Sequence, residues 1–359
     1  MSQTIILVVL IPLASAIAAS VLVLYNERAT RILVIAAGMA QTVVVALLAQ
    51  EVVSGGAVVY RLGSWESPLA ITLVADPLSV FFLVVVSAGY VIFLVHAASE
   101  EQVSRRHLWT LSALFATGLS GMILAGDLFN LFVFMEIASV TSAGLITHKQ
   151  RAEGAGVGFI YLIFASVSGL LFLAAIILVY AETGSLNMAG VAAAIPSMSG
   201  TSYPIVIGLC IASLGMKFGL VPFHLWQAPA YTAAGSSVAG FLSGVGMKAY
   251  LYVLIRLLVH VFQTGTFATG IGPADVSAGI GMVVLIAGLV NILAGHLFAL
   301  AERELKRMLA FSSVAHVGYI LVGLATVLAL ADTGSAASLS RAAAAGALLH
   351  VAYHALIKS

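Results

Sequence analysis

Long apolar runs recur along the whole chain, and they restrict its fold more than any other feature. A transmembrane helix needs about 20 consecutive, mostly apolar residues. Hydrophobic residues make up 62% of the sequence and charged residues only 8%, so the chain cannot build a soluble surface. We therefore predict an all-α, polytopic transmembrane bundle of eleven helices, which cover residues 3–24, 31–50, 78–98, 108–126, 128–147, 157–181, 204–226, 236–262, 275–300, 306–330 and 341–358.

The basic residues predict how this bundle is oriented. Loops on the cytoplasmic side of a membrane carry an excess of lysine and arginine. With the N-terminus outside, the outer loops contain only Arg61 and Arg341. We therefore expect an integral membrane protein with an external N-terminus. As a separate expectation, we assign it to a bacterial or archaeal plasma membrane. The inner loops then contain nine basic residues: Arg28, Arg31, Arg105, Arg106, Lys149, Arg151, Arg303, Lys306 and Arg307.

Two stretches between the runs predict structure at the outer face. Apolar side chains alternate over residues 58–62, which predicts the first strand of a short outer β-hairpin. Asp76 followed by Pro77 is typical of a helix start. Residues 182–203 predict a second outer loop. Arg256 lies near an outer helix end, where we expect it to extend toward water and serve structure.

Few ionisable residues lie deep inside the apolar runs, and these are candidates for function. An ionised side chain at the bilayer centre costs at least about 2.5–3.5 kcal/mol, so it faces a partner or water. Glu136, Lys217 and Lys248 are such residues. A carboxylate and a lysine at matched depth can exchange protons, because burial and mutual attraction favour opposite protonation states. The alternative is a static ion pair that only holds helices together.

A predicted helix break lies next to Lys217. Pro222 lacks a backbone donor and Gly219 loosens the preceding turn, so the run should break near residues 219–223. Irregular backbone at membrane depth occurs only inside protein or beside a water-filled cavity. A broken helix that carries a lysine is typical of a transport site. The alternative is a proline kink that serves packing alone.

Titratable residues also form a stripe on the last predicted helix. His350, His354 and Lys358 recur every four residues and therefore share one face. Histidine can transfer protons near neutral pH, so the stripe is a candidate proton path. Two alternatives stay open: buried histidines that are simply hydrogen-bonded, and histidines on facing helices that bind haem.

Several classes of function lack support in the sequence. The net charge of +1 gives no electrostatic case for nucleic acid. The single cysteine, Cys210, excludes an internal disulfide and a cysteine-based metal cluster. The sequence has no Walker loop, dinucleotide fingerprint or metal-ligand spacing. We therefore predict no cofactor, no metal site and no bond-making catalysis by this chain alone.

Four segments resemble the proton-translocating antiporter-like family. This family includes the large membrane subunits of complex I, the multisubunit (Mrp-type) sodium/proton antiporters and the membrane-bound hydrogenases. The segment that ends at Glu136 is most similar to the D-type subunits of the Mrp antiporters or to their hydrogenase counterpart. The four segments are DPLS at 76–79, GDLFNLFVFME at 126–136, KFGLVPFH at 217–224 and ELKRMLAFSS at 304–313.

This resemblance implies roles for the candidate residues. Glu136 would pair with Lys217 on a broken seventh helix, with His224 after the break among the proton-transfer residues. Lys248 would pass protons along a hydrated central axis. The residues that would continue this axis are His316, His350, His354 and Lys358.

The resemblance also implies how the chain is divided. Residues 1–107 would form N-terminal helices with the hairpin, residues 108–262 a first five-helix repeat, and residues 263–359 an incomplete, inverted second repeat. Family members usually carry an aspartate after the break, which residues 226–230 lack. Family members also have more helices than this chain, so we expect a truncated or split subunit, or a half-channel completed by a neighbouring chain.

These observations predict a proton-translocating subunit of a multisubunit cation (Na⁺)/proton antiporter. Its expected partners are other membrane subunits of the same complex, the lipid bilayer, protons and sodium. One alternative is the equivalent subunit of a proton-pumping oxidoreductase or hydrogenase. An alternative of another class is a haem-carrying membrane anchor.

Overall fold

Helices make up nearly all of the described chain. The structure, a computed structural model, describes residues 3–64, 71–100, 106–148, 152–262, 273–330 and 337–358. The elements are α1 (Thr4–Leu22), α2 (Glu27–Gly55), β1 (Val58–Arg61), β2 (Thr72–Ala75), α3 (Pro77–Ser99), α4 (Arg106–Leu124), α5 (Leu128–Thr147), α6 (Ala152–Thr183), α7 (Met188–Ala194), α8 (Ser202–Phe218), α9 (Gln227–Ala233), α10 (Ser236–Phe241), α11 (Met247–Ile255), α12 (Pro273–Ala301), α13 (Leu305–Ala329) and α14 (Ala337–Lys358).

The predicted membrane-spanning bundle is confirmed. In the described part of the chain, ten helical segments are long and apolar enough to cross a membrane, and they match the first ten predicted runs. The eleventh run forms α14, which is helical as predicted but is not one of these ten. The orientation stays a prediction, and Arg105, Lys149 and Arg151, on which it partly depends, lie outside the described residues.

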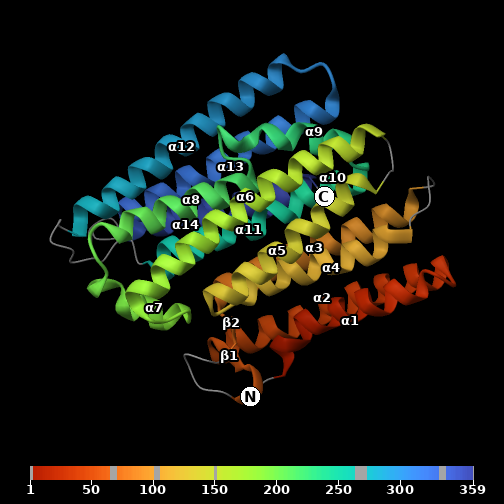
Figure 1. Ribbon diagram of the computed structural model, residues 1–359, viewed down its shortest axis with the longest axis horizontal. Helices are drawn as coiled ribbons and strands as arrows, with labels where there is room; N and C mark the ends of the chain where they lie inside the picture. The colour runs from red at the N-terminus through yellow and green to blue at the C-terminus, as the bar shows by residue number, and fades with distance from the viewer. Residues whose placement is uncertain are drawn as a thin grey trace.

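The long helices lie side by side in one bundle, with α1 and α2 along one edge and α12 along the opposite edge (Figure 1). Helix α1 packs against α2 and α4, α6 packs against α8, and α13 packs against α12 and α14. The strands β1 and β2 and the short helix α7 lie at one end of the bundle, which we call the hairpin end. Helices α9 and α10 lie at the other end (Figure 1).

The hairpin end contains both predicted outer segments. Strands β1 and β2 pair antiparallel, with Val58 opposite Ala75, as the alternation predicted. Asp76 caps α3 as predicted, because its side chain accepts a hydrogen bond of 2.9 Å from the Ser79 amide. The stretch 182–203 connects α6 to α8, as expected of a loop, but it also contains a short helix that was not predicted. The Asn187 side chain accepts from two backbone amides and starts the helix α7 within that stretch.

Two of the predicted spans are interrupted. The first breaks as predicted: α8 ends at Phe218, and Gly219 takes the left-handed conformation (φ 79°) before the chain turns into α9. The second continues from α10 through α11 but contains two π-helical stretches, Leu242–Gly246 and Arg256–Val261. π-Helical stretches are rare in proteins, and those that occur often lie at functional sites. They were not predicted from the sequence.

Candidate functional site

A carboxylate and an amine from different helices meet within the bundle. Glu136 lies on α5 and Lys217 lies in the last turn of α8. The distance from Glu136 Oε1 to Lys217 Nζ is 3.7 Å. The Lys217 side chain is 1% exposed, whereas the Glu136 side chain is 34% exposed. The amine is therefore enclosed by protein, and the carboxylate lies at the edge of the bundle.

Two further oxygens hold the Lys217 amine. Its Nζ donates to Ser139 Oγ at 2.5 Å and to the Ala165 carbonyl at 3.0 Å. The ring centre of Tyr250 lies 5.9 Å from the same nitrogen, which is within the range of a cation–π contact. Ser139 follows Glu136 by three residues on α5, so the two side chains share a face. Sequence reasoning missed Ser139, although this spacing was a usable signal.

The Glu136 carboxylate is only partly engaged. Its Oε1 atom is buried and accepts no hydrogen bond among the described residues. Gly169 of α6 leaves room for the group, since a Cβ at that position would lie 3.0 Å from the Glu136 carboxyl carbon. Buried polar atoms are normally hydrogen-bonded, so an unpartnered one needs an explanation. Oε1 can accept a proton, or it can accept a hydrogen bond from Lys217 if the amine moves closer.

A buried amide from another helix holds the break next to Lys217. Asn291 of α12 is 0% exposed. Its Oδ1 accepts from the Val221 amide at 2.8 Å, and its Nδ2 donates to the Gly219 carbonyl at 3.4 Å. The groups freed by the break are thus satisfied inside protein, as membrane depth requires. Sequence reasoning missed Asn291, although it is the one carboxamide in the apolar run 275–300.

Lys248 lies deeper than Lys217 and has different partners. It is 0% exposed and sits on α11 directly after the first π-helical stretch. Its Nζ donates to the Ser243 carbonyl of that stretch at 2.7 Å and contacts Nδ1 of His354. The wider π-helical turn therefore supplies an oxygen ligand to the buried amine.

Three predicted histidines gather next to Lys248. The ring centres of His354 and His316 lie 4.5 Å apart, and His316 Nδ1 lies 2.9 Å from His350 Nε2. We call Lys248, His354, His316 and His350 the lysine–histidine cluster. The recorded hydrogen bond of Lys358 goes elsewhere, since its Nζ donates to the Leu309 carbonyl of α13 at 2.8 Å.

A small gap separates the two groups of charges. The hydrogen bonds of the described residues do not join Lys217 to Lys248. A cavity of about 10 Å³, lined by Lys217, Tyr250 and Met247 among others, lies between α8 and α11. That volume is near the lower limit for a single water molecule. The lining includes Met247, the residue before Lys248, but not Lys248 itself.

His224 lies elsewhere. It is 5% exposed, and its ring stacks on Phe298 of α12 at 5.5 Å with an angle of 13° between the planes. Phe311 of α13 contacts it from the side. The structure thus brings Glu136 and Lys217 together but packs His224 against aromatic rings of other helices.

The histidines offer little support for haem. His316 and His350 are hydrogen-bonded to each other, which leaves no room for a porphyrin between them. In the described chain, no group of three His, Cys, Asp or Glu residues could hold a metal ion. The geometry of the cluster fits direct contact between titratable groups rather than ligation.

The expectation that Arg256 extends toward water is wrong, whereas its contacts fit the expectation that it serves structure. Instead of extending toward water, it forms a two-pronged ion pair with Asp76, with Nη1–Oδ2 at 2.6 Å and Nη2–Oδ1 at 2.7 Å. Burial opposes ionisation of Asp76. The hydrogen bonds from Arg256 and Ser79 and the charge of Arg256 outweigh it, and they hold the pKa of the carboxyl well below its usual range.

The fold and its buried charges define an integral membrane protein of the antiporter-like class. Residues 125–359, which include the Glu136–Lys217 pair and the lysine–histidine cluster, match the family described as NADH:quinone oxidoreductase/Mrp antiporter, transmembrane. The chain belongs to this family.

Individual relatives and a solved structure agree with this assignment. The NADH-quinone oxidoreductase subunit N of Desulforudis audaxviator is 37% identical over 98% of this chain and 67% of its own length. The D-type subunit of a probable K⁺/H⁺ antiporter of Rhizobium meliloti is 32% identical over 90% of this chain and 60% of its own length. A chain of the Mrp complex from Dietzia sp. DQ12-45-1b superposes with a TM-score of 0.82 at 25% identity, covering 100% of this chain and 63% of that one.

Proposed function

We propose that this chain is a proton-translocating membrane subunit of a multisubunit cation/proton antiporter. The observation that carries the proposal is the Glu136–Lys217 pair: an enclosed amine 3.7 Å from a carboxylate whose Oε1 has no hydrogen-bond partner among the described residues. A static ion pair normally needs hydrogen bonds to offset the cost of burying its charges. The spare acceptor of Glu136 instead suits a pair whose members exchange a proton.

The route begins at the bundle edge. Glu136, which is partly exposed, takes up a proton and passes it to Lys217. A water in the small cavity next to Tyr250 carries it toward Lys248. From Lys248 it passes along the histidines of the lysine–histidine cluster, where each member contacts the next. Histidine suits this task because its protonation changes near neutral pH.

A second candidate is a subunit of a redox-driven proton pump. The 37% identity to an NADH-quinone oxidoreductase subunit favours this candidate. The buried charges do not distinguish the two candidates, since they would serve either complex. The two candidates differ in what drives the protons. An antiporter exchanges them for a cation, and the named relatives include one for potassium, whereas an oxidoreductase couples them to electron transfer.

The proposal also includes partner subunits, an orientation in the membrane and a division into repeats. Other membrane subunits cover parts of the apolar surface, the N-terminus faces outward, and residues 108–262 form the first repeat, followed by part of a second. The chain spans about two thirds of the length of its relatives, so any assay uses the protein together with its partner subunits.

Vesicles that contain the assembled complex test the proposal. A pH gradient is imposed and followed with a dye while sodium or potassium is added. We expect one of these cations to dissipate the gradient, and we expect Glu136→Ala and Lys217→Ala to abolish the response in an assembled complex. The control is Glu27→Gln, an exposed residue at the start of α2. A gradient that responds to quinone reduction and to neither cation favours the oxidoreductase.

A further inference from the structure

A buried tyrosine hydroxyl beside Lys217 has no hydrogen-bond partner. Tyr250 of α11 is 4% exposed, and its hydroxyl forms no hydrogen bond among the described residues. Its ring centre lies 5.9 Å from Lys217 Nζ, and both side chains line the small cavity of about 10 Å³. Ser139 is near the Tyr250 hydroxyl, but the two do not reach hydrogen-bond geometry. A buried hydroxyl without a partner needs an explanation.

The oxygens that surround the Lys217 amine all act as acceptors. Ser139 Oγ and the Ala165 carbonyl both accept from Nζ. The hydrogen of the Ser139 hydroxyl is already used, because it donates to the Met135 carbonyl at 2.6 Å. The Glu136 carboxylate, 3.7 Å away, only accepts when it is ionised. These oxygens suit an ammonium group, whereas a neutral amine also needs a donor for its lone pair.

The ionisable side chains around Lys217 leave one available donor of this kind. Glu136 of α5 lies on one side, and the cavity on the other side is lined by three phenols, which are Tyr161 of α6, Tyr231 of α9 and Tyr250 of α11. The Tyr231 hydroxyl accepts from Gln227 Nε2 at 3.3 Å. His224, on the segment that follows α8, stacks on Phe298 instead. Among the three tyrosines, Tyr250 combines a ring contact to Nζ with a buried, unbonded hydroxyl.

We propose that the Tyr250 hydroxyl donates a hydrogen bond to the neutral Lys217 amine through one water in the small cavity, and that this bond allows Lys217 to give up its proton. The proposal deepens the proposed function and rests on it. After Lys217 has passed its proton on, Glu136 is ionised and offers no donor. A water that accepts from Tyr250 and donates to the amine has the two polar partners that a buried water needs. Tyr250 keeps its own proton, so it is a positioning residue.

Tyr250→Phe keeps the ring and removes only the hydroxyl. The neutral amine then loses its donor, while the ammonium keeps its acceptors. The acid limb of the pH profile of proton flux should therefore move up by about one pH unit. Flux at neutral pH should fall about tenfold and recover at alkaline pH. The melting temperature should not fall, since the hydroxyl has no partner to lose among the described residues.

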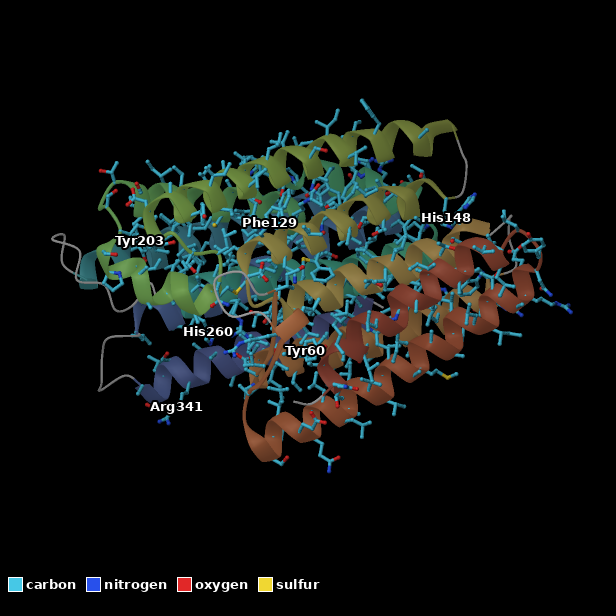
Figure 2. All side chains as sticks on the ribbon, turned by 60° about the horizontal axis from the view of Figure 1, so that its bottom comes forward. Tyr60, Phe129, His148, Tyr203, His260 and Arg341 are labelled. Atoms are coloured by element: carbon cyan, nitrogen blue, oxygen red, sulfur yellow. The ribbon has the colours of Figure 1, made fainter. Side chains whose placement is uncertain are left out.

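The measurement is the initial rate of cation-triggered proton flux over a series of pH values, in vesicles of the assembled complex. The matched control is Tyr203→Phe on α8, where the hydroxyl donates to the Phe262 carbonyl at 3.2 Å. Figure 2 shows Tyr203 toward the hairpin end of the molecule, whereas Lys217 lies in the last turn of the same helix. We expect Tyr203→Phe to keep the wild-type pH profile.

The possible results separate the role of Tyr250 from a structural effect. Flux of Tyr250→Phe that is unchanged, or that is lowered by the same factor at every pH, would overturn the proposal. A lower melting temperature of this variant, or an equal shift of the profile in Tyr203→Phe, would overturn it as well. If Glu136→Ala and Lys217→Ala transport normally, the proposed function itself fails. If both abolish flux and Tyr250→Phe keeps the wild-type profile, the role of Tyr250 alone fails.

Discussion

Glu136, Lys217 and Lys248 have surroundings that match different tasks. Glu136 is partly exposed and has an unused acceptor, as suits a group that receives protons. Lys217 is enclosed and held by oxygens from α5 and α6. Lys248 is fully buried and contacts a histidine rather than a carboxylate. Lys217 thus has a carboxylate nearby, whereas the partners of Lys248 are a backbone carbonyl and a histidine.

Gly169→Ala should weaken transport without unfolding the protein. The added Cβ would lie 3.0 Å from the Glu136 carboxyl carbon and displace it from Lys217. We expect the rate of proton flux in vesicles to fall about tenfold, since a small misplacement of a transfer group is costly. The control is Gly156→Ala on the same helix, where a Cβ meets no atom within 4 Å. Equal rates for both variants would contradict the placement of Glu136.

The Asp76–Arg256 pair predicts a pH dependence of stability. The pKa of Asp76 is lowered in the folded protein, so its contribution is present above the unfolded pKa and is lost as the pH falls through and below it. The difference in melting temperature between wild type and Asp76→Asn should be constant from about pH 8 to 5 and shrink below about pH 4. Scanning fluorimetry measures this difference, and a difference that grows on acidification would contradict the assignment.

The interrupted helices are the elements that build the site. The break after α8 places Lys217 at a helix end beside α5 and α6, and Asn291 of α12 satisfies the freed backbone. The first π-helical stretch comes directly before α11, and its Ser243 carbonyl accepts a hydrogen bond from the Lys248 amine. The first π-helical stretch is buried. The break is exposed at Pro222, and its freed backbone groups at Gly219 and Val221 are bonded by Asn291.

Asn291→Ala should destabilise the protein, because it removes the side chain that bonds the backbone of the break. It removes the acceptor of the half-buried Val221 amide, and an unsatisfied donor costs up to about 1–3 kcal/mol. We expect a lower melting temperature and lower flux together, because Lys217 depends on the same segment. The control is Leu293→Ala on the same helix, where the side chain is 63% exposed. A melting temperature as high as that of the control would contradict the role of Asn291.

The sequence predicted the elements better than their contacts. The spans, the hairpin and the break follow from local patterns, namely apolar length, alternation and the Gly219–Pro222 spacing. The ion pair of Arg256 joins residues 180 positions apart, and the sequence contains no local signal for it. The π-helical stretches were missed because they lie within one long, mostly apolar run, 236–262, without a proline to mark an interruption. His224 was chosen for its place next to the break, but its ring packs on Phe298.

At the scale of the whole molecule, the candidate proton-transfer residues lie in two places, one at the edge of the bundle and one in its interior. Glu136 lies at the edge of the bundle, whereas the lysine–histidine cluster lies where α11, α13 and α14 meet. Ten segments provide the apolar surroundings. The relatives are named as subunits of an NADH-quinone oxidoreductase and of a probable K⁺/H⁺ antiporter.

Proton flux in vesicles of the assembled complex tests the central claim most directly. It compares Lys217→Ala with Arg28→Ala, an exposed basic residue, at equal amounts of assembled protein. The account predicts that Lys217→Ala lowers the cation-triggered flux at least about 100-fold, as expected when a positioned proton-transfer group is removed, while Arg28→Ala keeps the wild-type rate. Wild-type flux in the assembled Lys217→Ala complex would contradict it.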